Sequence, residues 1–168
     1  MKDFDKHIII NIAKQSLSLY KHNIEICHYR VSTAKNGIGS QQDSGCTPLG
    51  QHIIAQKIGG HEPINAVFVG RVPTGEIYSA ELGANHPERD WILTRILWLQ
   101  GLEEGVNKGS NDKGGCDTYQ RYIYIHGTPD NEPMDLPLSH GCVRMRNQDI
   151  VELYDKIEEG MAVAIIVS

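Results

Sequence analysis

The sequence has no run of basic residues and no apolar stretch long enough to cross a bilayer. Its 168 residues carry a formal net charge of −5, with 16 lysines and arginines against 21 aspartates and glutamates. A protein that binds nucleic acid or an anionic membrane surface needs a concentrated positive patch. We therefore expect neither nucleic acid nor a membrane among the partners of this protein.

The N-terminal apolar run is too short for the core of a signal peptide. Residues 8–12 read Ile-Ile-Ile-Asn-Ile, Lys14 follows, and no small-residue cleavage site comes after it. A secretory signal has an uninterrupted apolar core of about 7–15 residues, and a membrane-spanning helix needs about 20. The expected location is the cytoplasm, or the periplasm if a leader has been removed.

Cysteine is scarce, and its spacing is not that of a zinc knuckle. The four cysteines, Cys27, Cys46, Cys116 and Cys142, include no Cys-x-x-Cys pair. In an oxidising compartment they could form two disulfides. A reducing compartment agrees better with the N-terminal sequence, and it would leave every thiol available for chemistry.

No internal repeat, low-complexity tract or interdomain linker interrupts the chain. Its 40% hydrophobic and 22% charged residues are ordinary for a globular protein, and its length is enough to bury a core without disulfides. Short apolar runs between turn residues predict one mainly β domain over residues 1–168. Strands are expected at residues 8–12, 17–20, 23–31, 51–57, 66–72, 92–99, 121–125 and 161–167.

One segment near the C-terminus predicts a helix. Asn147 is a favoured N-cap residue, and Asp149 places a negative charge in the first turn. Apolar residues follow at helical spacing, and Gly160 stands where a C-terminal glycine belongs. The segments expected to be loops, from their glycine, proline and polar residues, are 36–45, 101–117 and 129–137.

A histidine and a cysteine carry the strongest chemical signal. His126 follows the expected strand 121–125 and precedes Gly127, and Cys142 lies within Ser-His-Gly-Cys-Val-Arg-Met at residues 139–145. The thiolate is the attacking form of cysteine, and a thiol supplies only a few per cent of it at pH 7 unless a base assists. The pair therefore favours acyl transfer, with Cys142 as nucleophile and His126 as base.

Alternation along the expected strand predicts which way its side chains point. Ile123 and Ile125 share the face assigned to the core. Tyr122, Tyr124 and His126 share the other face, so the imidazole is expected to emerge at the end of the strand on a polar, aromatic surface.

Backbone groups beside the pair suit the same chemistry. Gly127 is expected to let the chain turn, with its carbonyl placed to orient the imidazole. Gly141 allows the backbone to pass close to a substrate. Successive amides of His140, Gly141 and Cys142 are expected to point at one developing oxyanion, which is usually the largest catalytic contribution in acyl transfer.

Other interpretations of these residues stay open. A lone cysteine is more often a small buried hydrophobe than a nucleophile, which is our interpretation of Cys27 and Cys116. Cys116, His126, His140 and Cys142 also have the ligand types of a tetrahedral zinc site. Papain-like peptidases place the cysteine before the histidine, the reverse of the order here, although convergent sites arise in any order.

The His-Gly-Thr at residues 126–128 with the run at 139–145 closely resembles the signature of the L,D-transpeptidase family of peptidoglycan enzymes. Segments 8–20, 31–34 and 47–50 also resemble elements of that catalytic domain, so the resemblance covers essentially the whole chain. It implies a mainly β, L,D-transpeptidase-like β-sandwich with one or two short helices. It also implies a lid-like excursion before the catalytic strand.

The resemblance implies a substrate and a mechanism as well. Cys142 would attack the L-centre carbonyl of diaminopimelate in a tetrapeptide stem, expel D-alanine and leave a thioester. His126 would take the thiol proton and deliver it to the leaving amine, with its tautomer held by the carbonyl of Gly127. Ser139 and Arg144 would organise the loop or bind substrate. Neither a cofactor nor a metal is implied.

The acceptor of the acyl group separates two activities. A second stem gives a direct diaminopimelate cross-link, a D-amino acid gives exchange, and water gives a tripeptide. Because cross-linking requires polymer outside the cytoplasmic membrane, we expect water: an L,D-carboxypeptidase that acts on soluble muropeptides during recycling. A domain that only binds zinc or wall peptide is the non-enzymatic alternative. The sequence does not predict an oligomeric state.

Overall fold

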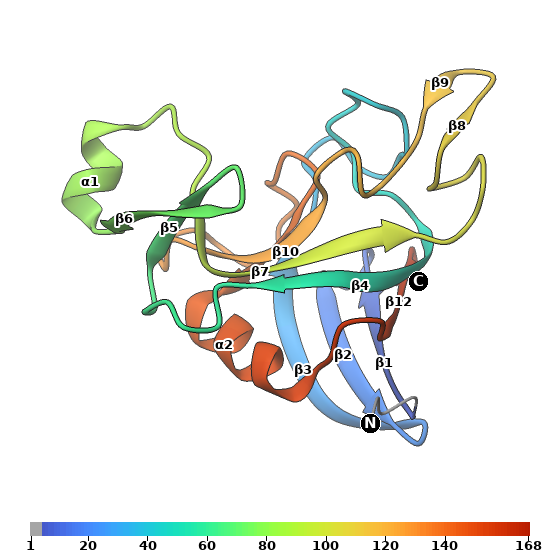
Figure 1. Ribbon diagram of the computed structural model, residues 1–168, viewed down its shortest axis with the longest axis horizontal. Coiled ribbons are helices and arrows are strands. Elements are labelled where there is room, and N and C mark those ends of the chain that lie inside the picture. The colour runs from blue at the N-terminus through green and yellow to red at the C-terminus, as the bar shows by residue number, and fades with distance from the viewer. Residues whose placement is uncertain (1–4) are drawn as a thin grey trace.

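The computed structural model describes residues 5–168, and β-strands dominate it (Figure 1). The strands are β1 Lys6–Asn11, β2 Ser16–Lys21, β3 Ile24–Ser32, β4 Gly50–Ile58, β5 Ala66–Val69, β6 Val72–Ile77, β7 Ile92–Gly101, β8 Ser110–Asn111, β9 Gly114–Gly115, β10 Tyr124–Thr128, β11 Val143–Arg146 and β12 Ala162–Ile166. The helices are α1 Ala80–Asn85 and α2 Asn147–Lys156. The expected mainly β class with one or two short helices is confirmed.

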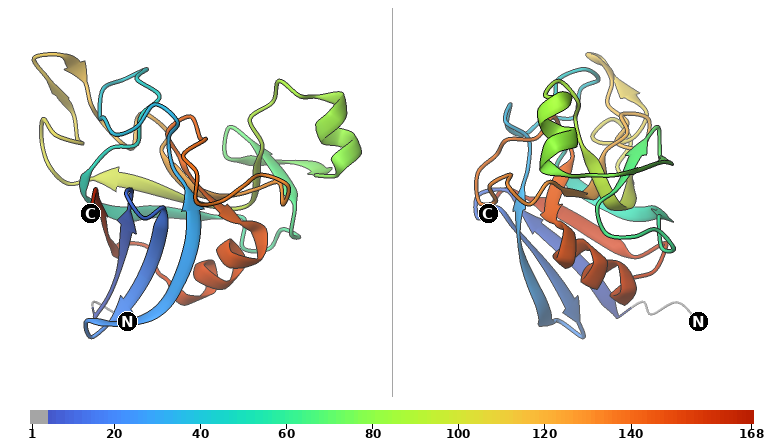
Figure 2. Two further views of the ribbon diagram at one scale, coloured as in Figure 1. Left: turned by 180° about the vertical axis from the view of Figure 1, so that it is seen from behind. Right: turned by 90° about the vertical axis from the view of Figure 1, so that its left-hand side faces the viewer.

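One sheet curves until it meets itself. Its hydrogen-bonded order is β10-β11-β3-β2-β1-β12-β4-β7-β5-β6, and β10 also pairs with β7. That extra pairing closes the strands from β10 round to β7 into a ring, so that β1–β3 face β4 and β7 across the core (Figure 1). The β5–β6 hairpin and α1 project away from this ring as a lobe (Figure 2). His126 of the motif lies on β10, and Cys142 lies just before β11.

Strand alternation supplies the core. Ile8 and Ile10 of β1 and Leu17 and Leu19 of β2 point inward and are fully buried. Burial of each such side chain stabilises the fold by about 1.5–3 kcal/mol relative to leaving it exposed. Helix α2 covers an opening of the ring and adds Ile150 and Leu153 of its expected apolar stripe to the same cluster. No helix within residues 5–168 is both long enough and apolar enough to cross a membrane.

The expected strand 66–72 is wrong in extent. The chain reverses at Gly70 and Arg71, whose φ angles are +56° and +67°, and continues as β6. The short α1 that follows was not predicted, because it buries no side chain and so carries no apolar periodicity. The Ser79 hydroxyl caps it by accepting a hydrogen bond from the Leu82 amide at 3.1 Å.

The expected strand 121–125 is shifted by three residues. A hydrogen-bonded turn occupies its first half, with the Arg121 amide donating to the Asp117 carbonyl at 2.9 Å. Tyr122 lies in that turn with φ +57°, so it is not part of the strand face. Strand β10 then runs on to Thr128, which places His126 inside the strand and not at its end. Ile123 and Ile125 do lie in the core, as expected.

The start of α2 differs from the N-cap prediction. The cap position is Arg146, and Asn147 is the first helical residue, with no side-chain cap bond at this end. The Asn147 amide group is instead buried among neighbouring segments. At the other end the helix stops at Lys156, and Gly160 lies in the following turn, where its amide donates to the Ile54 carbonyl at 2.7 Å.

Candidate functional site

Two of the three segments that resemble family elements, 31–34 and 47–50, hold the loop before β11. The Ser139 amide donates to the Thr33 carbonyl at 2.9 Å, and the Lys35 amide donates to the Ser139 carbonyl at 2.9 Å. From the other segment, the Thr47 hydroxyl donates to the Gly141 carbonyl at 2.9 Å. Segments about 100 residues away in the chain therefore determine where this loop can lie.

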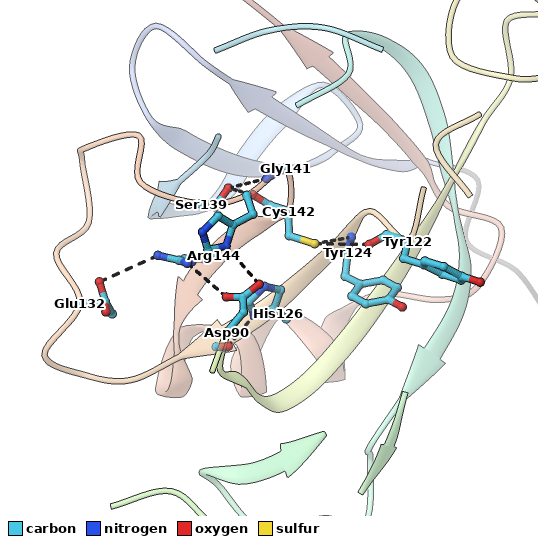
Figure 3. Close-up of polar contacts among 11 residues, drawn as sticks. Asp90, Tyr122, Tyr124, His126, Glu132, Ser139, Gly141, Cys142 and Arg144 are labelled. Atoms are coloured by element: carbon cyan, nitrogen blue, oxygen red, sulfur yellow. Dashed lines mark hydrogen bonds and ion pairs between the residues drawn. The ribbon is translucent and has the colours of Figure 1, made fainter. Parts of the chain in front are cut away.

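Within the loop, the Ser139 side chain forms hydrogen bonds with two backbone groups of the loop itself (Figure 3). Its hydroxyl donates to the Cys142 carbonyl at 2.5 Å and accepts from the Gly141 amide at 3.2 Å. Gly141 has φ +135°, a conformation that other residues rarely adopt. The Gly141 amide, expected to face an oxyanion, thus already donates to Ser139.

The Cys142 thiol points along the start of β10 (Figure 3). Its sulfur accepts from the Tyr124 amide at 3.3 Å and donates to the Tyr122 carbonyl at 3.4 Å. Burial raises the pKa of the thiol to about 12, although the Tyr124 amide acts in the opposite direction. Within residues 5–168, His126 is not among the hydrogen-bond partners of this sulfur. The surroundings of Cys142 therefore favour the neutral thiol.

His126 lies on the same strand and is 1% exposed. Its Nδ1 is 2.6 Å from the Gly127 carbonyl oxygen. A carbonyl can only accept, so Nδ1 carries the proton and Nε2 is left as the acceptor. Burial lowers the pKa of the imidazole, and the Gly127 carbonyl and the Asp90 charge only partly offset this. The neutral form is accordingly favoured at pH 7 for both the thiol and the imidazole.

Gly127 does not turn the chain, contrary to expectation, but a side chain would not fit there. The register between β10 and β7 shifts between His126 and Gly127. A Cβ at Gly127 would lie 2.6 Å from the Leu93 carbonyl oxygen. The glycine is needed for this close approach between β10 and β7.

Asp90 is a site residue that sequence reasoning missed. Its carboxylate lies 3.4 Å from His140 Nδ1 and 3.3 Å from Arg144 Nη2. Burial alone would raise the pKa of this carboxyl, but His126, Arg144 and His140 together outweigh it and lower the pKa. Arg144 also lies 3.9 Å from Glu132, in the loop after β10. Asp90 precedes β7 outside any motif, so no pattern in the sequence could have singled it out.

A pocket of about 460 Å³ opens over these groups. The residues that line it are Gly70, Arg71, Asp90, Ile92, Arg121, Tyr122, Ile123, Tyr124, His126, Ser139, His140, Cys142 and Arg144. A second cavity of about 460 Å³ lies beside it and shares Asp90, His140 and Arg144. The thiol thus faces a space large enough for part of a peptide, with another space next to it.

Comparison with known families agrees with this arrangement. The family model described as YkuD, the L,D-transpeptidase catalytic domain, matches residues 5–165. The chain belongs to the L,D-transpeptidase family. The resemblance drawn from the motifs, and the fold expected from it, are confirmed.

Curated relatives of this family match over part of their length. The chain is 48% identical over 46 residues to the probable L,D-transpeptidase YbiS of Escherichia coli strain K12, which is 27% of this chain and 15% of that protein. It is 46% identical over 84 residues to the probable L,D-transpeptidase ErfK/SrfK of Salmonella typhimurium, which is 45% of this chain and 27% of that protein. The matches therefore span about a quarter or less of these relatives.

Solved L,D-transpeptidases share the fold. L,D-transpeptidase 3 from Mycobacterium tuberculosis, in complex with a faropenem-derived adduct, superposes with a TM-score of 0.55 at 14% identity. The superposition covers 96% of this chain and 60% of that one. Nearly the whole chain is thus this family's catalytic fold.

The structure separates Cys116 from the other three residues of the zinc alternative. Cys116 is buried within the segment 101–117, with its thiol 3.7 Å from the Lys108 carbonyl oxygen. It does not line the pocket that holds Cys142. No group of three or more potential ligands in the described part of the chain could hold a metal ion, and all four cysteines are free thiols.

The segment 101–117, expected to be a loop before the catalytic strand, does not line the pocket either. It carries the small β8–β9 ribbon and is anchored by Asn107, which is fully buried. The Asn107 side chain donates to the carbonyls of Leu49 and Gln51 at 3.0 and 3.1 Å. The part of the lobe that does reach the pocket is the turn between β5 and β6.

Proposed function

We propose that this chain is a cysteine acyltransferase that opens the diaminopimelate–D-alanine bond of a peptidoglycan tetrapeptide stem. The observation that carries the proposal is that Cys142 and His126 line one pocket. The Nδ1 of His126 is bonded to the Gly127 carbonyl, so its Nε2 is left to accept a proton. A solved relative in complex with a faropenem-derived adduct supports acyl chemistry for this fold. The partner would be a stem peptide or a soluble muropeptide.

The reaction would start from a neutral pair. As the sulfur attacks the L-centre carbonyl, the thiol proton leaves the Tyr122 carbonyl and passes to His126 Nε2, so no standing thiolate is required. The Tyr124 amide, 3.3 Å from the sulfur, would stabilise negative charge there as it develops.

The tetrahedral intermediate would then collapse with release of D-alanine. His126 returns the proton to the leaving amine, and the acyl group stays on Cys142 as a thioester. We assign the oxyanion to the amides of His140 and Cys142, since the Gly141 amide donates to Ser139. Ser139 and Arg144 would position this loop and the Asp90 carboxylate, respectively.

A specific observation favours an amine as acceptor. The second cavity shares Asp90 with the pocket and adds Glu88 and Glu132, alongside Lys35 and Arg89. Mixed charges suit an incoming diaminopimelate stem, which carries both ammonium and carboxylate groups. The sequence favoured water as the acceptor, but that expectation rests on the N-terminal residues and not on any residue of the site. An amine acceptor would suit the periplasm, and water would suit the cytoplasm.

Mass spectrometry of the protein with a diaminopimelate tetrapeptide muropeptide tests the reaction. The expected results are a tripeptidyl adduct on Cys142 and release of D-alanine. The Cys142→Ala variant should form no adduct, and His126→Ala should be slower by about 10²–10⁴-fold. Cys27→Ala, a thiol change remote from the pocket, is the matched control. Full turnover by Cys142→Ala would disprove the assignment.

The same incubation with a second stem or a D-amino acid identifies the acceptor. Dimers or exchange products at the expense of tripeptide would support transpeptidation. Tripeptide alone, at every acceptor concentration, would instead establish the carboxypeptidase.

A further inference from the structure

Two arginines line the pocket without a carboxylate partner. Asp90 is the one acidic residue among the lining residues, and it already contacts His140 and Arg144. Within residues 5–168, neither Arg71 nor Arg121 forms an ion pair with an acidic side chain. In a chain of net charge −5, this leaves an uncompensated positive region beside the nucleophile. Such a region attracts an anionic ligand.

Arg121 has a structural use for its guanidinium. It donates to the carbonyls of Gly39 and Cys46 at 3.3 and 2.7 Å, and to the Ser44 hydroxyl at 3.3 Å. These oxygens fix it against the loop 36–46. Arg121 therefore contributes charge to the pocket while most of its donors are occupied.

Arg71 is held differently. Its guanidinium lies 4.9 Å from the ring centroid of Trp98 and 4.7 Å from that of Tyr122. Its one hydrogen bond within the described residues goes from Nη1 to the Tyr124 hydroxyl at 3.0 Å. A guanidinium has five N–H donors, so stacking positions this group while leaving it able to bind a carboxylate.

Arg71 occupies a turn position at which glycine is the favoured residue. Val69 pairs with Val72, so Gly70 and Arg71 form a two-residue hairpin turn, with both φ angles positive. Glycine is favoured at the second position of such a turn, and a longer side chain with positive φ is uncommon. Here that position places a charged side chain in the lining of the pocket. Tyr124 contacts both groups, since its hydroxyl accepts from Arg71 and its backbone amide donates to the Cys142 sulfur.

We propose that Arg71 binds a carboxylate of the acyl donor and thereby selects an acidic stem. The inference rests on the proposed function for the identity of the donor. A tetrapeptide stem offers two carboxylates near the reacting bond, on the terminal D-alanine and on the side chain of diaminopimelate. Either would form charge-assisted hydrogen bonds with the guanidinium.

Kinetics with amidated donors test the proposal and separate the two sources. Three donors are compared: the parent tetrapeptide, its D-alanine amide, and the diaminopimelate side-chain amide. With the natural residue at position 71, one amide should have a kcat/KM lower by about ten- to a hundredfold. Arg71→Met, which keeps an apolar contact with the rings, should lose the same factor on the parent donor, chiefly through KM. It should no longer distinguish acid from amide.

Two further variants sharpen this test. Arg71→Lys should recover part of the loss, because it keeps the charge without the planar fork. Arg30 is an exposed arginine that pairs with Asp135 and does not line the pocket. Arg30→Met should therefore leave the preference for the acid over the amide unchanged. The proposal would be overturned if Arg71→Met discriminated between the acid and the amide donors as strongly as the natural protein does.

Stem binding to Cys142→Ala, followed by tryptophan fluorescence, keeps this inference distinguishable from the proposed reaction. Binding that Arg71→Met weakens, with no turnover by the natural protein, would disprove the reaction and keep the carboxylate site. Turnover by the natural protein, with binding that Arg71→Met does not weaken, would keep the reaction and disprove the carboxylate site. Absence of binding by any donor would overturn both.

Discussion

Cys142 and His126 lie where the surrounding protein disfavours the charged form of each. Burial raises the pKa of the thiol to about 12 and lowers that of the imidazole. A thiolate–imidazolium pair is therefore not the resting state, and charge has to develop during the reaction. The Gly127 carbonyl and the negative charge of Asp90 both favour the imidazolium, because each raises the pKa of His126.

Replacing Asp90 should move the acid limb of the pH–rate profile. His126 must be neutral to accept the thiol proton, so activity falls as pH drops through its pKa. Asp90→Asn removes the charge that raises this pKa, so the acid limb of kcat/KM should shift to lower pH. The rate should also fall by about tenfold, since the imidazolium loses a stabilising charge. Kinetics of D-alanine release from pH 4 to 9 measure both effects.

A remote carboxylate provides the control. Asp135→Asn, which removes an exposed partner of Arg30, should leave the limb where it is. If Asp90→Asn left the acid limb of kcat/KM in place, or moved it to higher pH, Asp90 would be shown not to act on His126.

At the scale of elements, the beginning of α2 is bonded to β10, the strand that carries His126. The Asn147 side chain accepts from the Thr94 hydroxyl at 2.6 Å and donates to the Thr128 carbonyl at 2.9 Å. It also contacts Asn65 at 3.0 Å and Asp130 at 3.1 Å. One buried amide therefore joins the helix to β7, to β10 just beyond His126, and to the lobe.

Removal of the Asn147 side-chain amide should destabilise the fold. Asn147→Ala leaves buried partners unsatisfied and should lower the free energy of unfolding by about 2–4 kcal/mol. Urea denaturation followed by circular dichroism gives the value. Gln148→Ala, at an exposed position in the same turn, should change it by no more than about 0.5 kcal/mol. Equal stability of the two variants would refute a joining role for Asn147.

At the scale of the whole molecule, the closed ring buries titratable groups together with its core. His52 of β4 is fully buried, with Nδ1 3.0 Å from the Gly50 carbonyl oxygen and Nε2 2.9 Å from the Thr118 hydroxyl. Burial lowers the pKa of His52 to about 4. In the unfolded chain it returns to about 6.5.

This difference makes the fold sensitive to acid. Between pH 6.5 and 4 the unfolded chain binds a proton at His52 that the folded chain does not, so stability falls as pH falls. The contribution is up to about 3 kcal/mol, at about 1.4 kcal/mol for each pH unit. His52→Gln should flatten this part of the stability curve, measured by urea denaturation from pH 4 to 7. A variant curve parallel to that of the natural protein would contradict the assignment.

Local pattern alone was enough for much of this protein. The alternation of Ile8 with Ile10 and of Leu17 with Leu19 is a property of consecutive residues, and it predicted buried strands. The sequence around Cys142, with His126 upstream, indicated the family and its chemistry. Asn147 shows the limit of such reasoning, because its residue type favours a cap while its actual partners come from three other segments.

The tertiary structure decided everything that depends on residues far apart in the chain. Asp90 lies 54 positions before Arg144 and meets it only because the ring closes through β7 and β10. Arg71 reaches the pocket through a turn that divides an expected single strand. Even the state of the Cys142 thiol depends on the Tyr124 amide and on burial. Ion pairing, desolvation and pKa are set by distance in space, which a linear pattern does not contain.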